Sequence, residues 1–141
     1  MQKQILLLLV FCSSFVYSQT KNKDVQIVLQ HMKVQEDAWN NGKIPDFMNY
    51  YWKSDSLKFI GKKGITYGWQ QTLDNYLKSY PDKTAMGILK FSIKEATQLS
   101  PESIYIIGSW ELQKEKPVGG YFTLLWKKID SKWVIVSDHT S

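Results

Sequence analysis

Two carboxylates, Glu36 and Asp138, stand among apolar residues, where they could hold or move a proton. Burial in apolar surroundings disfavours the charged form of a carboxylate and raises its pKa toward the range useful for acid–base chemistry. Glu36 falls between Met32 and Trp39 in the apolar stripe of a predicted helix, so we expect it either to face a pocket or to pair with a lysine. Asp138 falls in the last apolar strand. The alternative for Asp138 is a strand-end carboxylate partly in water, because strand ends are usually wet.

Histidine chemistry and metal binding are not expected. His139 directly follows Asp138, so in a strand it points to the opposite face, and we predict a hydrogen-bonded interface residue there. If the faces are assigned the wrong way round, these two residues exchange roles. His31 lies toward the polar side of its predicted helix. Two distant histidines make no zinc or iron site, and the chain has no glycine-rich nucleotide loop, so no metal and no cofactor is predicted.

The first eighteen residues are predicted to be a secretory signal peptide. Lys3 gives a short basic start, an apolar run follows over residues 5–12, and small residues precede Gln19. The apolar run is much shorter than the roughly 20 residues that span a bilayer. We therefore expect a secreted or periplasmic protein, with a single domain over residues 19–141 and no contact with a membrane after cleavage. Cys12, the only cysteine, would leave with the signal, so packing alone must hold the domain.

The net charge is +5, and every basic residue is a lysine. Arginine is the preferred residue for bidentate recognition of phosphates and bases, and the chain has none. The lysines are also spread along the chain, with pairs only at residues 62–63 and 127–128, beside predicted turns. These features argue against nucleic-acid binding.

Hydrophobic periodicity predicts three helices followed by strands. The helices are expected over residues 24–41, around Pro45, and over residues 68–80, and a small hairpin flanks Gly61 to Gly64. Long strands are expected over residues 87–97, 104–114, 121–128 and 132–140. This order predicts an α+β fold, with three N-terminal helices packed on a curved antiparallel sheet.

The closing hairpin is apolar on both faces. Pairing Lys128 with Trp133 across a turn at Asp130 places on one face Tyr121, Thr123, Leu125, Val134, Val136 and Asp138, and on the other Phe122, Leu124, Trp126, Trp133, Ile135, Ser137 and His139. An antiparallel sheet usually exposes one polar face to water. Because neither face here is polar, we expect helices to cover one face and a second copy of the chain to cover the other, in a homodimer.

Three segments resemble the nuclear-transport-factor-2-like superfamily, the cone-shaped α+β fold that includes ketosteroid isomerase and SnoaL-like proteins. They are Ala38 to Gly42 ending helix one, Gly64 to Trp69 opening helix three, and the closing residues Lys132 to Ser141. The resemblance covers the chain beyond the signal peptide. It implies a ligand pocket between the helices and the concave sheet face, and dimerisation through the convex face.

The resemblance does not carry over the isomerase chemistry. It places the isomerase's oxyanion-donating tyrosine on Gln35, its catalytic base on Phe59 and its protonated aspartate near Thr123. Phenylalanine cannot accept a proton, so steroid isomerase activity is not predicted. The resemblance also implies that Asp138 lies at the pocket mouth as an acid, a base or a ligand anchor.

Three functional hypotheses remain open. The first is an exported binder of a small apolar or aromatic molecule, whose ligand-binding residues would be Gln35, Trp39, Tyr51, Trp69, Tyr76, Tyr121, Thr123 and Asp138. The second is a cofactor-free isomerase, cyclase or dehydratase with Asp138 or Glu36 as the proton carrier. The third is an assembly module whose cone is filled by side chains.

Overall fold

The computed structural model describes residues 13–141, with side chains from Lys23 onward. The signal peptide predicted for residues 1–18 lies mostly outside the described residues. Within the described part of the chain, no helix is both long enough and apolar enough to cross a membrane.

One long helix lies along the domain, and shorter helices follow it. Helix α1 spans Ser13–Asn40, and its buried side chains recur at helical spacing, at Val28, Met32, Gln35 and Trp39. Gly42, with φ of +74°, follows its end in the left-handed region that favours glycine. Shorter helices follow before the long strands, and the first of them are α2 at Ile44–Phe47, the 3-10 helix η1 at Met48–Tyr50, and α3 at Trp69–Ser79.

A fourth short helix, α4 at Lys83–Met86, was not predicted. Its cap is Asp82, whose carboxylate accepts a 2.8 Å hydrogen bond from the Ala85 backbone N–H. This turn carries the chain from α3 to the first long strand.

Six strands form one sheet in the order β2-β1-β6-β5-β4-β3. Their bounds are β1 Lys58–Gly61, β2 Gly64–Tyr67, β3 Ile88–Ser100, β4 Ser103–Gln113, β5 Val118–Ile129 and β6 Lys132–Thr140. The predicted α+β fold is confirmed, with one difference in the sheet. Strand β1 runs parallel to β6, which makes the sheet mixed rather than wholly antiparallel.

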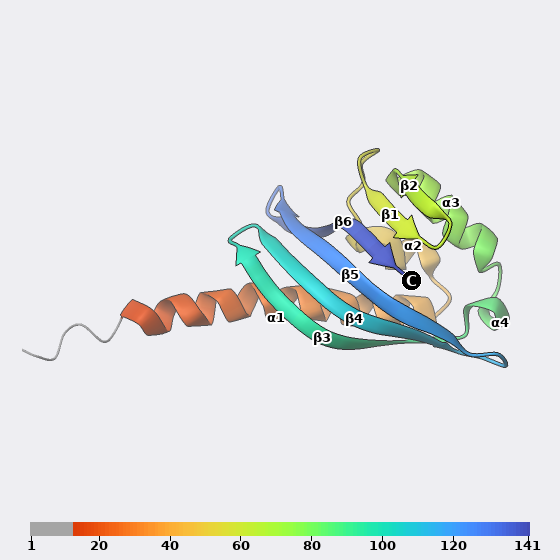
Figure 1. The fold of residues 1–141 in the computed structure, drawn as a ribbon, viewed down its shortest axis with the longest axis horizontal. Coiled ribbons are helices and arrows are strands. Elements are labelled where there is room, and N and C mark those ends of the chain that lie inside the picture. The colour runs from red at the N-terminus through yellow and green to blue at the C-terminus, as the bar shows by residue number, and fades with distance from the viewer. Residues whose placement is uncertain (1–12) are drawn as a thin grey trace, which may run out of the picture.

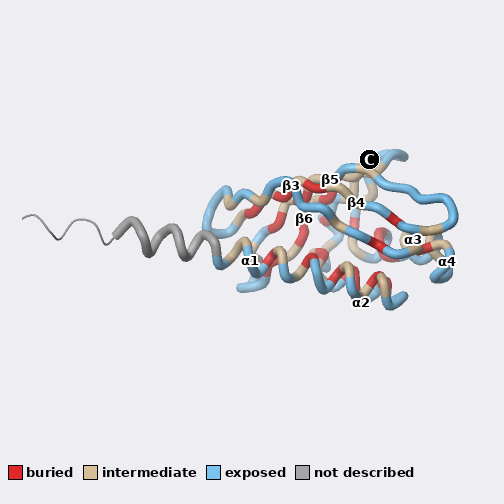
Figure 2. The backbone as a smooth tube through the Cα atoms, turned by 90° about the horizontal axis from the view of Figure 1, so that it is seen from below, coloured by how far each residue is buried: buried red, intermediate tan, exposed pale blue. Residues whose placement is uncertain are grey.

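The helices cover one face of the curved sheet. Helix α1 runs beneath β3, β4 and β5, while α3 and the β1–β2 hairpin lie at the end of the sheet where the chain terminates (Figure 1). Figure 2 shows the helical and sheet layers edge-on, with buried residues in both. The core lies between these layers.

A bulge in β6 decides which side chains face the helices. Lys128 pairs with Trp133, as predicted, but the register shifts after Trp126 and Ile135, so that Val136 is an extra residue and Asp138 pairs with Leu124. The predicted faces are therefore wrong beyond the bulge. Asp138 shares the inner face with Phe122 and Leu124, whereas Tyr121 and Thr123 belong to the outer face.

Candidate functional site

A cavity of about 620 Å³ lies between the helices and the inner face of the sheet. Most of its wall is aromatic or aliphatic. Its lining residues include Gln35, Trp39, Phe47, Tyr51, Phe59, Thr72, Tyr76, Tyr80, Leu89, Phe91, Trp110, Leu112, Phe122, Leu124, Asp138 and Thr140. The third hypothesis expected a cone filled by side chains, and the structure instead has open space there.

The polar centre of this cavity is a carboxyl–phenol pair. Asp138 is 5 % exposed, and its Oδ2 accepts a 2.7 Å hydrogen bond from the hydroxyl of Tyr51, which is also buried. Oδ1 of Asp138 is buried and has no hydrogen-bond partner among the described residues. A buried oxygen without a partner is costly, so it is the atom to which a ligand donor would add most.

Burial raises the pKa of Asp138 to about 7, and the hydrogen bond from Tyr51 opposes this rise only in part. Burial also raises the pKa of Tyr51 and of Tyr76 well above the ordinary phenol value, and the nearby negative charge of Asp138 raises both further. Near neutral pH the phenols are therefore donors, while the carboxyl can exist in either protonation state.

Aromatic rings hold the walls around this pair. The Tyr76 ring meets Phe47 edge-on at 5.6 Å and Phe59 at 5.7 Å between centroids. Trp39 meets Tyr80 at 4.9 Å in the same edge-to-face manner. Edge-to-face contacts of this kind fix ring orientation as well as excluding water. The cavity around the carboxyl–phenol pair is consequently a shaped, largely apolar space.

Gln35 lies in the cavity wall at 1 % exposure. Its Nε2 donates a 3.1 Å hydrogen bond to the carbonyl oxygen of Phe47, which ties α1 to α2. Phe59 also lines the cavity and pairs directly with Asp138 across the parallel strands β1 and β6. The position that the resemblance assigned to a catalytic base thus holds an apolar ring beside the aspartate.

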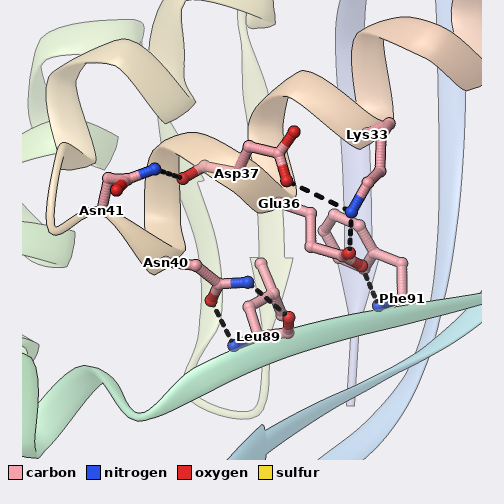
Figure 3. Close-up of polar contacts among 7 residues, drawn as sticks. All are labelled: Lys33, Glu36, Asp37, Asn40, Asn41, Leu89 and Phe91. Carbon is pink, nitrogen blue, oxygen red and sulfur yellow. Dashed lines mark hydrogen bonds and ion pairs between the residues drawn. The ribbon is translucent and has the colours of Figure 1, made fainter.

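Of the two alternatives for Glu36, facing a pocket or pairing with a lysine, the structure shows the second, and Glu36 does not line the cavity. Its Oε1 accepts a 2.9 Å hydrogen bond from Lys33, and its Oε2 accepts a 2.7 Å bond from the Phe91 backbone N–H (Figure 3). Asn40, one helical turn on, donates to the Leu89 carbonyl at 3.0 Å and accepts from the Leu89 N–H at 2.7 Å. Glu36 is therefore a structural residue that joins α1 to the edge strand β3.

Three other predicted ligand-binding residues lie away from the cavity lining. Trp69 is half-buried, and its indole N–H donates a 2.9 Å hydrogen bond to the Met48 carbonyl. Tyr121 is 66 % exposed and Thr123 pairs with exposed His139, because both alternate along β5 with the inward-facing Phe122 and Leu124. His31 was predicted on the surface, yet it is half-buried and stacks on Tyr50 at 4.5 Å between ring centroids.

Several lining residues were missed by sequence reasoning. Phe122, Leu124 and Thr140 were assigned to the wrong face or to none, and recognising the bulge would have found all three. Lys62, Lys63 and Lys78 also line the cavity, although the first two were interpreted only as turn residues. Within residues 13–141, no group of three histidine, cysteine or acidic side chains is arranged to hold a metal ion.

No protein-family model matches the sequence. No curated protein matches it either. Among solved structures, an NTF-2-like protein of unknown function from Shewanella oneidensis is 41 % identical, with a TM-score of 0.79 over 85 % of this chain and 98 % of that one.

More distant structures share the fold. A ketosteroid isomerase-like protein from Erwinia carotovora atroseptica is 17 % identical, with a TM-score of 0.66 over 85 % of this chain and 96 % of its own. An NTF2-like superfamily protein from Salmonella enterica is 16 % identical, with a TM-score of 0.65 over 89 % and 92 % of the two chains. On the strength of the 41 % identical structure, the chain belongs to the NTF2-like family.

Proposed function

We propose that the cavity binds a small, largely apolar or aromatic molecule, anchored at its polar end by Asp138 and Tyr51. The observation that carries this proposal is the buried, unpartnered Oδ1 of Asp138 in the lining of an aromatic space. Its volume of about 620 Å³ falls in the range of roughly 300–1,000 Å³ typical of small-molecule sites. Trp39, Tyr76 and Gln35 shape the wall around the anchor.

Two neighbouring residues offer a matched test. Leu124 lines the cavity, whereas Leu125 lies on the outer face, so Leu124→Trp fills the cavity and Leu125→Trp does not. The neutral fluorescent dye phenylnaphthylamine should bind the unmodified protein and the Leu125→Trp variant but not Leu124→Trp. Mass spectrometry of co-purifying molecules should give the same contrast.

Circular dichroism must show that both variants are folded. Should Leu124→Trp not fold, the smaller change Leu124→Phe takes its place and should weaken binding of the dye. Equal binding of the dye by folded Leu124 and Leu125 variants would refute a ligand site in this cavity.

A second candidate function is cofactor-free proton transfer by Asp138, as in an isomerase, cyclase or dehydratase. A carboxyl with a pKa of about 7 can both accept and donate a proton near neutral pH. The co-purified molecule, incubated with the protein in heavy water, should gain mass by hydrogen exchange at carbon. Asp138→Asn should still bind the molecule but leave its mass unchanged. A pure binder would show no exchange with either protein.

We also propose export and dimerisation. The basic start and apolar run of residues 1–18 support a signal peptide and a secreted or periplasmic location. Sequencing the N-terminus of protein expressed from the full gene should find Gln19 first; an intact Met1 would refute cleavage. The outer sheet face supports a homodimer, with half-buried apolar side chains at Tyr105, Ile107 and Leu125.

A further inference from the structure

Three exposed lysines, Lys62, Lys63 and Lys78, line the cavity, and we call their side of it the entrance. Lys62 and Lys63 form the turn between β1 and β2, and Lys78 lies near the end of α3. The hairpin and the helix are held together at this point, since Asn75 of α3 donates a 3.4 Å hydrogen bond to the Thr66 hydroxyl of β2.

These lysines lack acidic partners. The ion pairs found among the described residues involve Lys33 and Lys128 only. Among the described residues, Asp138 is the single acidic residue of the cavity lining, and unlike the lysines it is buried. The entrance therefore carries three lysines outside the ion pairs of the described residues, and a cleft with low-dielectric walls concentrates the field of such charges.

The strand geometry sets the distance between the two ends. Phe59 pairs with Asp138, and Lys62 follows three residues further along the same hairpin. At about 3.3 Å per residue, the lysine turn begins roughly 10 Å from the level of the carboxyl. Aromatic and aliphatic side chains line the space between them.

We propose that the ligand is an amphipathic anion, with an apolar or aromatic body, a neutral polar group at Asp138 and an acidic group roughly 10 Å away at Lys62, Lys63 and Lys78. This inference rests on the proposed function of the cavity. A carboxylate or sulfonate at the entrance gains from several flexible ammonium groups while staying partly hydrated, so its charge is not buried at a cost. A neutral group at the inner end can hydrogen-bond with the carboxyl and phenol there.

Two related dyes separate charge from shape. Anilinonaphthalene sulfonate and phenylnaphthylamine share an arylamine on naphthalene, and only the first carries an anionic group. The test variant replaces Lys62, Lys63 and Lys78 with glutamine. The control variant replaces Lys90, Lys116 and Lys132, which are exposed and outside the cavity lining, so it makes the same change in net charge.

The sulfonate dye should bind the test variant about fivefold more weakly than the unmodified protein, since exposed ion pairs are individually weak. Raising sodium chloride from about 50 mM to about 500 mM should remove most of that difference by screening. The neutral dye should bind both triple variants equally, and the control variant should hold the sulfonate dye as tightly as the unmodified protein. Phenylnaphthylamine should displace the sulfonate dye, which shows that both occupy the cavity.

The outcomes distinguish the proposal of an anionic ligand from the proposal that the cavity binds a ligand at all. If the neutral dye binds but the sulfonate dye is indifferent to the entrance lysines, the anionic ligand class is wrong and the cavity site stands. Equal weakening by both triple variants would also overturn it, because the effect would then come from overall charge. If neither dye binds the folded protein, both the anion and the cavity proposals fail.

Discussion

Because the carboxyl of Asp138 is buried, the stability of the folded protein should depend on pH. Its pKa is 3.8 when unperturbed and is raised to about 7 in the folded protein, chiefly by desolvation. Between these values the folded protein keeps a proton that the unfolded chain has released. The proton bound by Asp138 in the folded state therefore contributes to the free energy of unfolding. This contribution is complete below about pH 4 and is lost as the pH rises through about 7.

Replacing Asp138 with asparagine should remove this loss of stability with rising pH. The difference in free energy of unfolding between Asp138→Asn and the unmodified protein should therefore shift by about 2 kcal/mol in favour of the variant as the pH rises from about 5 to about 8. Urea unfolding at both pH values measures the difference. Asp55→Asn, which changes an exposed carboxyl, serves as the control and should show no comparable trend. A constant difference between Asp138→Asn and the unmodified protein would mean that this carboxyl is not held in its neutral form.

At the scale of elements, the contact between α1 and β3 depends on a match of spacings. Residues four apart in a helix are about 6 Å apart along its axis, and residues two apart in a strand are about 6.6 Å apart. Glu36 and Asn40 therefore reach the backbones of Phe91 and Leu89, which lie on the free edge of the sheet (Figure 3). Side chains of α1 thus form hydrogen bonds with edge-strand backbone groups that a neighbouring strand would otherwise bind. They protect this edge from pairing with another chain.

Removing the carboxylate of Glu36 should leave the Phe91 N–H without its partner. We expect Glu36→Ala to lower the free energy of unfolding by about 1 kcal/mol, the lower end of the usual cost of an unsatisfied donor, because the Phe91 N–H is only part-buried. Asp37→Ala is the control, because Asp37 also pairs with Lys33 but through an exposed carboxylate. Its effect should be under about 1 kcal/mol. Chemical denaturation measures both, and equal effects would show that only the lysine contact matters.

The elements were more predictable than the site. The helical spacing of Val28, Met32 and Trp39 predicted α1, and Asp130 and Ser131, both with positive φ, form the predicted turn of the last hairpin. Helix α4 has four residues, too few for a periodic pattern. Strand alternation grouped Tyr121 and Thr123 with Asp138 because nothing in β6 itself marks Val136 as the extra residue, and the family resemblance then placed that face in the pocket. A bulge is set by the curvature of neighbouring strands, which a local pattern does not contain.

For the whole molecule, the prediction to test is dimerisation through the outer face of the sheet. Within a single chain, Tyr105, Ile107 and Leu125 on this face remain only half-buried. A homodimer through this face should give a sedimentation mass near twice that of one chain at micromolar concentration. Ile107→Lys should shift the protein to monomer, because it would bury a lysine charge in an apolar interface.

The matched control is Leu77→Lys, which changes a residue that is 44 % exposed and belongs to helix α3 rather than to the outer face of the sheet. It should leave the sedimentation mass unchanged. A monomer for the unmodified protein would refute the dimer, while the cavity and its ligand class would be unaffected.

The extra residue Val136 has a consequence for how relatives diversify. Which of two adjacent titratable residues faces the cavity depends on whether the bulge is present, not on which amino acids the strand contains. A homologue that lacks the extra residue would keep the pairs Trp126–Ile135 and Leu125–Ser137 in a regular ladder, so its carboxyl would still face inward. A homologue of the same length without the bulge would instead turn the imidazole of His139 inward, because regular alternation puts Ile135, Ser137 and His139 on one face. Loss of the bulge alone would therefore exchange an acid for a base in the cavity, with no amino acid replaced.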